Sequence, residues 1–285
     1  MSHRCCGRDF DAGDIALIRR LIAEDPQRTR AELSRLTCRA LHWRKPDGGL
    51  KDMSARAAIL RMHDDGLIAL PPPRGKRPDP RVRISARSDP GEPLDMPAGA
   101  LPAPVFQRVR TRDESRLWNE YIQRCHDLGH KPLPGAQLRY TVYSAGQPIA
   151  LLGFGAAAWM SAPRDHSIGW SHAQRRRQLH LVVNNARFLI LPWIHAHNLA
   201  SMLLAKAAKL LPEHWQDAYA YRPVLLETFV EKPRFRGTCC HAANWVRLGT
   251  TKGRGKLGPT GKPSVPIRDL WVYPLDRHFR ALLTR

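Results

Sequence analysis

The sequence predicts an α/β (α+β) protein with two folded parts, and three observations lead to this prediction. Helical periodicity with capping signals fills the first 70 residues, whereas strand-like apolar runs alternate with helical patterns after residue 113. A stretch rich in proline and arginine separates the two regions. The chain has 285 residues, of which 43% are hydrophobic, so it is long enough to bury real cores. We therefore expect domains at residues 1–70 and 113–285, joined by a linker at residues 71–112.

Three short helices are predicted in the N-terminal domain. An apolar stripe at helical spacing forms the first, and Thr29 with Glu32 makes a T-x-x-E capping box for the second. The third covers about residues 53–65 and ends at Gly66, and residues 67–70 are predicted to form a short strand. This layout is that of a winged helix-turn-helix, whose third helix enters the major groove of DNA.

Basic side chains in and before the third helix are the candidate DNA contacts of this domain. They are Arg44, Lys45, Lys51, Arg56 and Arg61. The alternative is a small helical bundle used for protein contact, because residues 1–70 carry 13 basic and 10 acidic side chains and are nearly balanced.

Positive charge dominates the rest of the chain. The protein has 46 Lys and Arg against 25 Asp and Glu, a net charge of +21, and most of the excess lies beyond residue 70. Such an excess predicts a polyanionic partner, DNA or another nucleic acid, with a generically basic surface as the alternative. The candidate phosphate contacts lie in an arginine run and in a Gly/Lys-rich stretch: Arg175, Arg176, Arg177, Lys252, Arg254 and Lys256.

The C-terminal domain is predicted to contain a mixed sheet with flanking helices. Two alternating segments form a hairpin, and two apolar strands with a helix between them imply a crossover between parallel neighbours. In order, we predict a helix near residue 117, strands at 138–143 and 149–154, a polar loop with a helical turn at 164–178, a strand within 179–193, a helix at 198–211 capped by Asn198, a strand at 224–230, a helix at 241–248, a strand at 270–273 and a helix at 276–283.

Polar side chains interrupt both apolar strands of this crossover. Asn184, Asn185 and Arg187 lie within the first, and Glu227 lies within the second. Side chains near the carboxyl ends of adjacent parallel strands converge on one crevice, so these groups are expected to meet. A carboxylate in an apolar strand has to be paired or functional, and an ion pair with Arg187 is the structural alternative. The candidate catalytic residues are Glu227, Asn185, Arg187 and Asn244.

The six cysteines do not indicate a metal site. They include two adjacent pairs, Cys5 with Cys6 and Cys239 with Cys240, and no CxxC motif occurs. We therefore expect neither metal nor cofactor, and a reducing, cytoplasmic environment fits best. No apolar run is long enough to cross a bilayer, so no membrane partner is expected.

The C-terminal domain resembles the Druantia anti-phage system protein A family over roughly residues 115–285. The resemblance is carried by the segments LRYTVY, LLGFGAAAW, IGWS, LHLVVNNARFLILPW, NLAS, LLETFVE, RFRGTC, AANWVRLGTTKGRG and VYPL. It implies a role in bacterial defence against phage, or life on a mobile element, with other defence-system proteins as partners. It does not imply a particular molecular activity.

A second resemblance is to the acetyltransferase (GNAT) fold, through the order hairpin, strand, helix, strand, helix. The C-terminal domain is therefore predicted to be a GNAT-like mixed sheet. Acetyltransferases hold the pyrophosphate of acyl-CoA on a Gly-rich turn that opens the helix after the central strand. That turn is PWIHAHN at residues 192–198 and contains no glycine, which argues against acyl-CoA binding.

Three functions follow from these observations. The leading hypothesis is a DNA-associated component of an anti-phage defence system or mobile element that binds nucleic acid through a basic surface. The first alternative is a GNAT-type acyltransferase acting on a protein or RNA amine. The second is a metal-dependent DNA-cleaving or strand-transfer enzyme, in which Glu227 would help to hold Mg²⁺.

Overall fold

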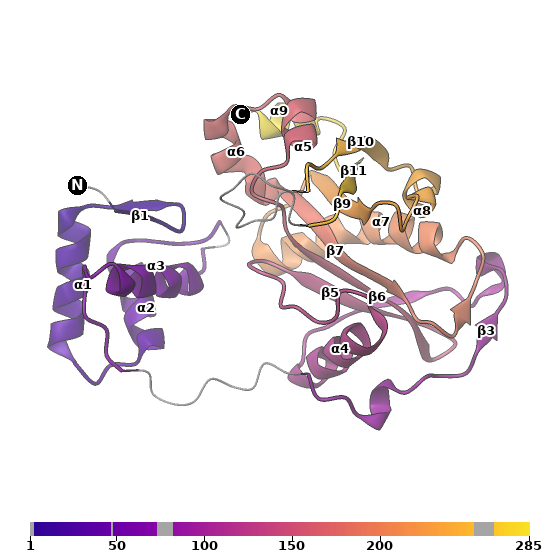
Figure 1. Ribbon diagram of the computed structural model, residues 1–285, viewed down its shortest axis with the longest axis horizontal. Coiled ribbons are helices and arrows are strands. Elements are labelled where there is room, and N and C mark those ends of the chain that lie inside the picture. Colours follow the sequence, from indigo (N-terminus) through magenta and orange to yellow (C-terminus); the bar gives the residue numbers. More distant parts are fainter. Residues whose placement is uncertain (1–2, 47, 73–81, 254–264) are drawn as a thin grey trace. The chain divides into compact units, whose positions relative to one another are not determined.

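The chain divides into two compact units, Met1–Pro80 and Arg81–Arg285 (Figure 1). A computed structural model describes residues 3–46, 48–72, 82–253 and 265–285. Each unit has its own core, and each is described separately below.

The first unit contains a hairpin and three helices. Its elements are β1 (His3–Cys5), β2 (Arg8–Phe10), α1 (Ala12–Glu24), α2 (Arg30–Ala40) and α3 (Asp52–Asp64). Phe10, Ile18, Leu33 and Met62 are almost fully buried between them. The three predicted helices are present, and the Thr29 side chain accepts a hydrogen bond from the Glu32 amide at 3.2 Å, which is one of the two hydrogen bonds of the predicted capping box.

The strand predicted at residues 67–70 is not formed, which corrects one part of the winged helix-turn-helix prediction. Gly66 adopts a positive φ of 73° and ends α3, and the amides of Leu67 and Ile68 then turn back to the Met62 carbonyl at 2.8 and 3.3 Å. These amides are therefore used to cap the helix. The strand pairing of this unit lies instead in the hairpin of β1 and β2, so a winged helix-turn-helix remains a prediction.

The second unit is built on a seven-stranded mixed sheet in the order β10-β11-β9-β7-β6-β5-β4. The strands are β4 (Val105–Arg108), β5 (Leu138–Ser144), β6 (Gln147–Ala156), β7 (Val182–Ile190), β9 (Leu225–Glu231), β10 (Val246–Thr250) and β11 (Arg268–Pro274). Among the described strands of this sheet, β7 and β9 pair in parallel and the other neighbours are antiparallel. A short second pair joins β3 (Leu94–Asp95) to β8 (Ile194–His195). The predicted order of hairpin, strand, helix, strand and helix is confirmed.

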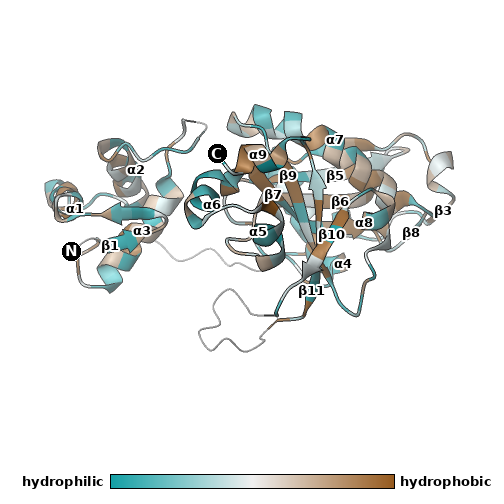
Figure 2. Cartoon of the chain, turned by 90° about the horizontal axis from the view of Figure 1, so that it is seen from above, coloured by the Kyte–Doolittle hydropathy of each residue, from teal (hydrophilic) through white to brown (hydrophobic). Residues whose placement is uncertain are grey.

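Helices cover both faces of the sheet (Figures 1 and 2). They are α4 (Arg112–Cys125), α5 (Ala162–Ile168), α6 (His172–Gln178), α7 (Leu199–Tyr219), α8 (Thr238–Ala242) and α9 (Phe279–Leu283). The long helix α7 connects β7 to β9, and α8 packs beside it. We call this side of the sheet the α7 face. The central strands β7 and β9 each begin with buried apolar residues, whereas their later residues are only partly buried.

The opposite side, which we call the α4 face, is identified by the strand register. Trp118 of α4 lies over Gly153 of β6. Gly155 lies on the same face, two residues later in β6. Paired residues of neighbouring strands point to the same face, so Asn184, which is paired with Gly155, and Glu227, which is paired with Asn184, also lie on the α4 face. Glu227 contacts Arg164 of α5. The helices α4 and α5 therefore cover the same face of the sheet, over different strands.

Several elements of this unit differ from the prediction. The polar segment 164–178 forms α5 and α6, because a capping box of Ser171 and Gln174 begins the second of them. Helix α7 continues through the buried Pro212 to Tyr219, and Asn198 precedes it with a φ of 65° and no side-chain cap. The helix predicted at residues 241–248 is divided into α8 and β10.

The linker is shorter than predicted, because residues 82–112 pack within the second unit. The Ser85 amide and hydroxyl both donate to the buried carboxylate of Glu120, at 3.0 and 2.7 Å. Further along, Leu94 pairs with Ile194. Hydrogen bonds and strand pairing therefore fix a stretch whose proline content predicts a spacer.

Within the described ranges, none of the helices combines the length and apolar character needed to cross a bilayer.

Candidate nucleic-acid interface

A β-bulge divides the polar cluster of β7 between the two faces of the sheet. Phe154 is paired with Asn185, whereas the preceding residue of β6, Gly153, is paired with Arg187. Ala186 is therefore the extra residue of the bulge. In a regular strand Asn185 and Arg187 would share a face, but the bulge places Asn185 on the α7 face and Arg187 on the α4 face.

The sheet opens immediately after this bulge. The parallel pairing of β7 with β9 ends at Asn185 and Thr228, where the Thr228 hydroxyl donates to the Asn185 carbonyl at 3.1 Å. Beyond that point β7 remains paired with β6, and β9 remains paired with β11. Residues 186–190 and 229–231 are accordingly only partly buried. Arg187 lies at the start of this opening.

The guanidinium of Arg187 is half-buried and incompletely bonded. One terminal nitrogen donates to the Ala186 carbonyl at 2.7 Å, and Nε is buried without a hydrogen-bond partner. The Oδ1 atom of Asn184, on the same face, is likewise buried without a partner. Trp118 and Leu133 pack closely around Gly153 beside Arg187, since a Cβ there would meet all three side chains at 3.2–3.3 Å. Arg187 and Asn184 therefore retain unused hydrogen-bonding capacity beside the tightly packed side chains around Gly153.

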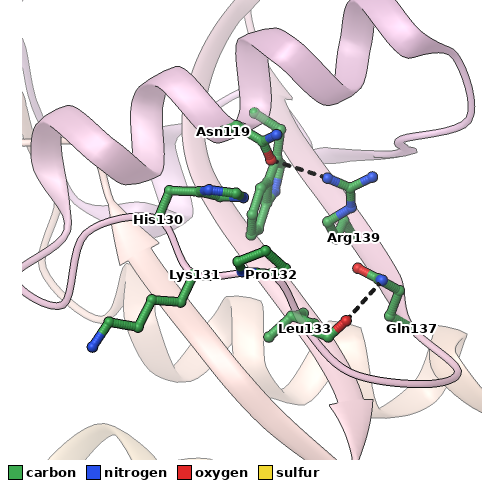
Figure 3. A pocket seen from close by; sticks show the side chains of 8 residues that line it. Asn119, His130, Lys131, Pro132, Leu133, Gln137 and Arg139 are labelled. Atoms are coloured by element: carbon green, nitrogen blue, oxygen red, sulfur yellow. Dashed lines mark hydrogen bonds between the residues drawn. The ribbon is translucent and has the colours of Figure 1, made fainter. Parts of the chain in front are cut away.

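A pocket of about 200 Å³ adjoins the packed side chains of Trp118 and Leu133 (Figure 3). It is lined by Trp118, Asn119, His130, Lys131, Pro132, Leu133, Gln137 and Arg139, among which there is no Asp or Glu. Arg139 donates to the Asn119 side-chain oxygen at 3.1 Å, and its guanidinium lies over the Trp118 ring at 5.3 Å. Figure 3 shows His130 pointing inward, whereas Lys131 extends away from the other side chains. The polar lining is thus cationic or neutral.

Electrostatics on this face favour an anion. Burial lowers the pKa of Arg139, and burial together with the charge of Arg268 lowers the pKa of Arg187. Burial followed by Arg187 lowers the pKa of His126, and burial followed by Arg139 and Arg187 lowers that of His130. Both imidazoles are therefore mainly neutral at pH 7, whereas the guanidiniums keep their charge. A bound anion would relieve the unfavourable burial of these charges.

Glu227 lies elsewhere on the α4 face, in a closed ion-pair network. Its carboxylate and the Arg164 guanidinium are both fully buried and lie 2.9 Å apart. The Ala158 amide donates to the same carboxylate at 2.9 Å, and Arg164 donates to the Ala158 carbonyl at 2.8 Å. Asp165 bridges Arg164 and Arg175, at 2.9 and 3.1 Å. Burial raises the pKa of Glu227, and Arg164 opposes this shift. The ion-pair partner is thus Arg164 and not the predicted Arg187.

The four candidate catalytic residues do not come together. Glu227 is enclosed beside α5, and Arg187 lies at the opening of the sheet. Asn185 is buried on the α7 face, where its amide donates to the Arg187 carbonyl at 3.4 Å. Asn244 is exposed after α8 with a φ of 61°. The bulge and the closed ion pair are the two reasons for this separation.

The predicted phosphate contacts of the second unit occupy different environments. Arg175 is buried in the ion-pair network, whereas Arg176 is exposed. Arg177 donates to the Arg285 carbonyl at 3.0 Å, and Lys252 is exposed. Arg254 and Lys256 lie outside the described residues.

The predicted DNA contacts of the first unit lie in α3 and in the turn before it. Arg44 donates to the Gly48 carbonyl at 2.9 Å, the Lys45 amide donates to the Gly49 carbonyl, and Lys51 precedes α3. On α3, Arg56 is partly buried and Arg61 lies 3.8 Å from the Cys5 sulfur. DNA contact by these residues remains a prediction.

Sequence reasoning missed Arg139, His126, His130 and Arg164. Arg139 occupies one of the alternating positions of β5, but alternation alone does not show which face an arginine takes. The histidines fall in a segment broken by Gly and Pro, where no periodicity places a side chain. The arginine run beginning at Arg175 is visible in the sequence, but the pairing of Arg175 with Asp165 depends on tertiary structure.

No curated protein matches this chain. Solved structures similar to the chain include the ribosomal-protein-S18-alanine N-acetyltransferase from Escherichia coli, at 8% identity with 61% of this chain and 95% of that one covered (TM-score 0.37). A spermidine N-acetyltransferase mutant from Vibrio cholerae matches at 14% identity, covering 59% and 76% (TM-score 0.33). An N-acetyltransferase from Staphylococcus aureus Mu50 matches at 14% identity, covering 59% and 79% (TM-score 0.33). Likeness at this level does not bear on function.

The amino-acid sequence matches the model of one protein family. The sequence model of the family described as Druantia protein DruA matches residues 78–261, which is more than half of the chain and includes β7, the bulge and the pocket. This chain therefore belongs to the Druantia protein DruA family.

Proposed function

We propose that the second unit binds the phosphate backbone of nucleic acid through its α4 face, as one component of a bacterial anti-phage defence system. The DruA family supports the defence context, and other proteins of the same system are the expected partners. The observation that carries the proposal is the pair of half-buried guanidiniums, Arg139 and Arg187, next to a pocket lined without a carboxylate.

Other charges around this surface leave the two arginines available. Asp127 follows His126 but is paired with Arg234 at 2.6 Å, and Arg268 is paired with Glu231 at 3.7 Å. Guanidinium groups match the geometry of phosphate oxygens, and partial removal from water strengthens the attraction. A phosphate at this surface would pair with the charge of the half-buried Arg187 guanidinium. The large basic excess of the chain would add attraction at long range.

The test compares two doubly substituted proteins that lose the same charge. In the first, Arg139→Gln is combined with Arg187→Gln. In the control, Arg87→Gln is combined with Arg124→Gln, whose guanidiniums already pair with Asp113 and Asp89 at 2.8 and 2.6 Å. Binding of a fluorescent oligonucleotide is titrated at several salt concentrations, after circular dichroism confirms that both proteins fold.

We expect the Arg139/Arg187 double variant to bind more weakly and to show a shallower dependence of log Kd on log salt. The slope should fall by about 1.8, since each phosphate contact contributes roughly 0.9 for duplex DNA. The control should retain nearly all of the affinity. Equal weakening of the two proteins would show only an effect of net charge, and a wild-type protein that fails to bind at low salt would overturn the proposal.

A further inference from the structure

One tryptophan of this protein is exposed although the other seven are buried. The relative exposure of Trp159 is 53%, whereas no other tryptophan exceeds 9%. Met160 beside it is exposed at 62%. Both residues lie between β6 and α5, at a position where a polar residue would avoid the cost of hydrating a large apolar side chain. An exposed aromatic group next to another exposed apolar group is a common feature of binding surfaces.

The backbone on both sides of Trp159 is held by the buried ion-pair network. Before it, the Ala158 amide and carbonyl are bonded to Glu227 and Arg164, both fully buried. After it, the Ser161 amide donates to Asp165 at 3.3 Å. A buried ion pair of this kind does not tolerate separation of its partners. Trp159 is therefore presented on a fixed loop, which reduces the entropy lost when its ring binds a ligand.

The charge around Trp159 identifies the chemistry of the ligand. The Arg175 guanidinium, which is fixed by Asp165, lies over the Trp159 ring at 5.6 Å. Of the seven arginines in residues 162–178 and 276–285, Arg164 and Arg175 are buried in the ion-pair network, and the other five are exposed: Arg176, Arg177, Arg277, Arg280 and Arg285. These segments contact each other, since Arg177 donates to the Arg285 carbonyl and Arg280 donates to the Ser167 carbonyl. An aromatic ring bordered by such a basic surface is the arrangement that binds single-stranded nucleic acid.

We propose that Trp159 stacks on an unpaired base of a bound nucleic-acid strand. The proposal rests on the function proposed above and specifies which nucleic acid is preferred. The bases of a duplex already stack on one another, so a protein ring gains most from a base that is single-stranded or extruded. Ala158 is bonded to Glu227 on the α4 face, so Trp159 belongs to the same side of the sheet as Arg187. The backbone and a base of one strand would thus be bound on a single face.

The experiment uses the full chain with Trp159→Ala, Trp159→Tyr and a matched control, Phe235→Ala. Phe235 is also half exposed, at 50%, and also lies under an arginine, since Arg234 is 5.2 Å from its ring. The probes are a labelled oligothymidylate and a duplex of the same length. Urea denaturation of each variant checks that folding is retained.

We expect Trp159→Ala to weaken binding of the single strand by about 5- to 150-fold, which corresponds to roughly 1–3 kcal/mol for one stacked base. Duplex affinity should change less than about twofold, and both Trp159→Tyr and Phe235→Ala should stay close to wild type. The single strand should quench part of the tryptophan fluorescence of the wild type, and this quenching should be absent in Trp159→Tyr.

Two results would overturn the stacking role. The first is a Trp159→Ala protein with wild-type affinity for the single strand, as expected if this ring contacts a protein. The second is equal weakening for single strand and duplex. In both cases salt-dependent binding by the wild type would leave the proposed function intact. If the wild type binds neither probe, both proposals fail.

Discussion

At the scale of single side chains, the fully buried ion pair of Arg164 and Glu227 requires the most exact placement of its hydrogen-bonding partners. Each charge has lost its water, and the compensation comes from the partner, the Ala158 backbone and Asp165. Pairs of this kind stabilise little overall, but removal of one partner leaves the other charge uncompensated. Glu227 therefore has a structural role, because it holds the backbone of the loop that carries Trp159.

Replacement of this carboxylate should reduce stability sharply. We expect Glu227→Gln to lower the free energy of unfolding by about 3 kcal/mol, because Arg164 keeps only Asp165 as an acidic partner. Urea denaturation followed by circular dichroism measures the change. The control Asp113→Asn removes an exposed carboxylate that pairs with Arg87, and should change the free energy of unfolding far less, because solvent screens an exposed ion pair. Equal costs for both variants would contradict this view of Glu227.

The sequence correctly predicts that Glu227 is paired or functional, but it does not identify the partner. A carboxylate in the run LLETFVE has to be paired or functional, and it is paired. Its partner lies 63 positions earlier, in a segment predicted to be a loop, so no local pattern could identify Arg164. Arg139 and the two histidines escaped notice for the same reason, because their surroundings are created by packing between distant segments.

At the scale of elements, α4 depends on its first turn. The Thr111 side chain accepts from the Glu114 amide at 3.1 Å, and the Glu114 carboxylate accepts from the amides of Thr111 and Arg110 at 2.9 and 2.8 Å. These backbone hydrogen bonds, with one from Gln107, lower the pKa of Glu114 to about 2. The helix that begins here carries Trp118 and Asn119 of the pocket.

Removal of this cap gives a pH-dependent effect. Glu114→Ala should destabilise the second unit by about 1 kcal/mol at pH 7, as loss of a helix cap usually does. Because the folded pKa lies below the usual value of the carboxyl group, the stabilisation is complete above about pH 4.5 and is lost as the pH falls toward 2. Thermal unfolding of wild type and variant should therefore differ at pH 7 and converge near pH 2. A difference independent of pH would argue against the carboxylate as its source.

Elements were predicted most reliably where periodicity was long. The hairpin of β5 and β6 and the crossover of β7, α7 and β9 follow directly from alternation, apolar runs and helical spacing. Short elements were predicted less accurately: one helical turn was expected where α5 and α6 form, and the helix expected at residues 241–248 overlaps only the end of α8, because helices of five to seven residues depend on packing. The bulge at Ala186 leaves no sign in the residue pattern, and it is the feature that decides which polar groups of β7 meet.

At the scale of the whole molecule, the boundary between units determines what folds alone. Residues 82–112 contribute β4, which pairs with β5, and Ser85, which bonds the buried Glu120. A stretch whose composition predicts a spacer thus forms an edge of the sheet. Proline density indicates where helices cannot form, but it does not show whether an extended segment packs on a neighbour.

Two fragments test this boundary. A fragment of residues 82–285 should unfold with the same midpoint as the second unit of the full chain, because it retains every strand of the sheet. A fragment of residues 113–285, which follows the sequence-predicted boundary, should unfold at a clearly lower temperature, since it lacks β4 and the hydrogen bonds to Glu120. Differential scanning calorimetry of both measures this. Identical midpoints would show that residues 82–112 contribute no stability.

The bulge at Ala186 links the number of residues between Asn185 and Arg187 to the face on which each side chain lies. If Ala186 were an ordinary residue of a regular strand instead of the extra residue of a bulge, Asn185 and Arg187 would share a face, so Arg187 would point into the packed layer beneath α7 and Phe188 would take its place on the α4 face. Deletion of Ala186 would instead keep Arg187 on the α4 face, because Arg187 would then follow Asn185 directly and successive strand residues point to opposite faces. In related chains, the spacing between the asparagine pair and the arginine should therefore be as informative as the residues themselves.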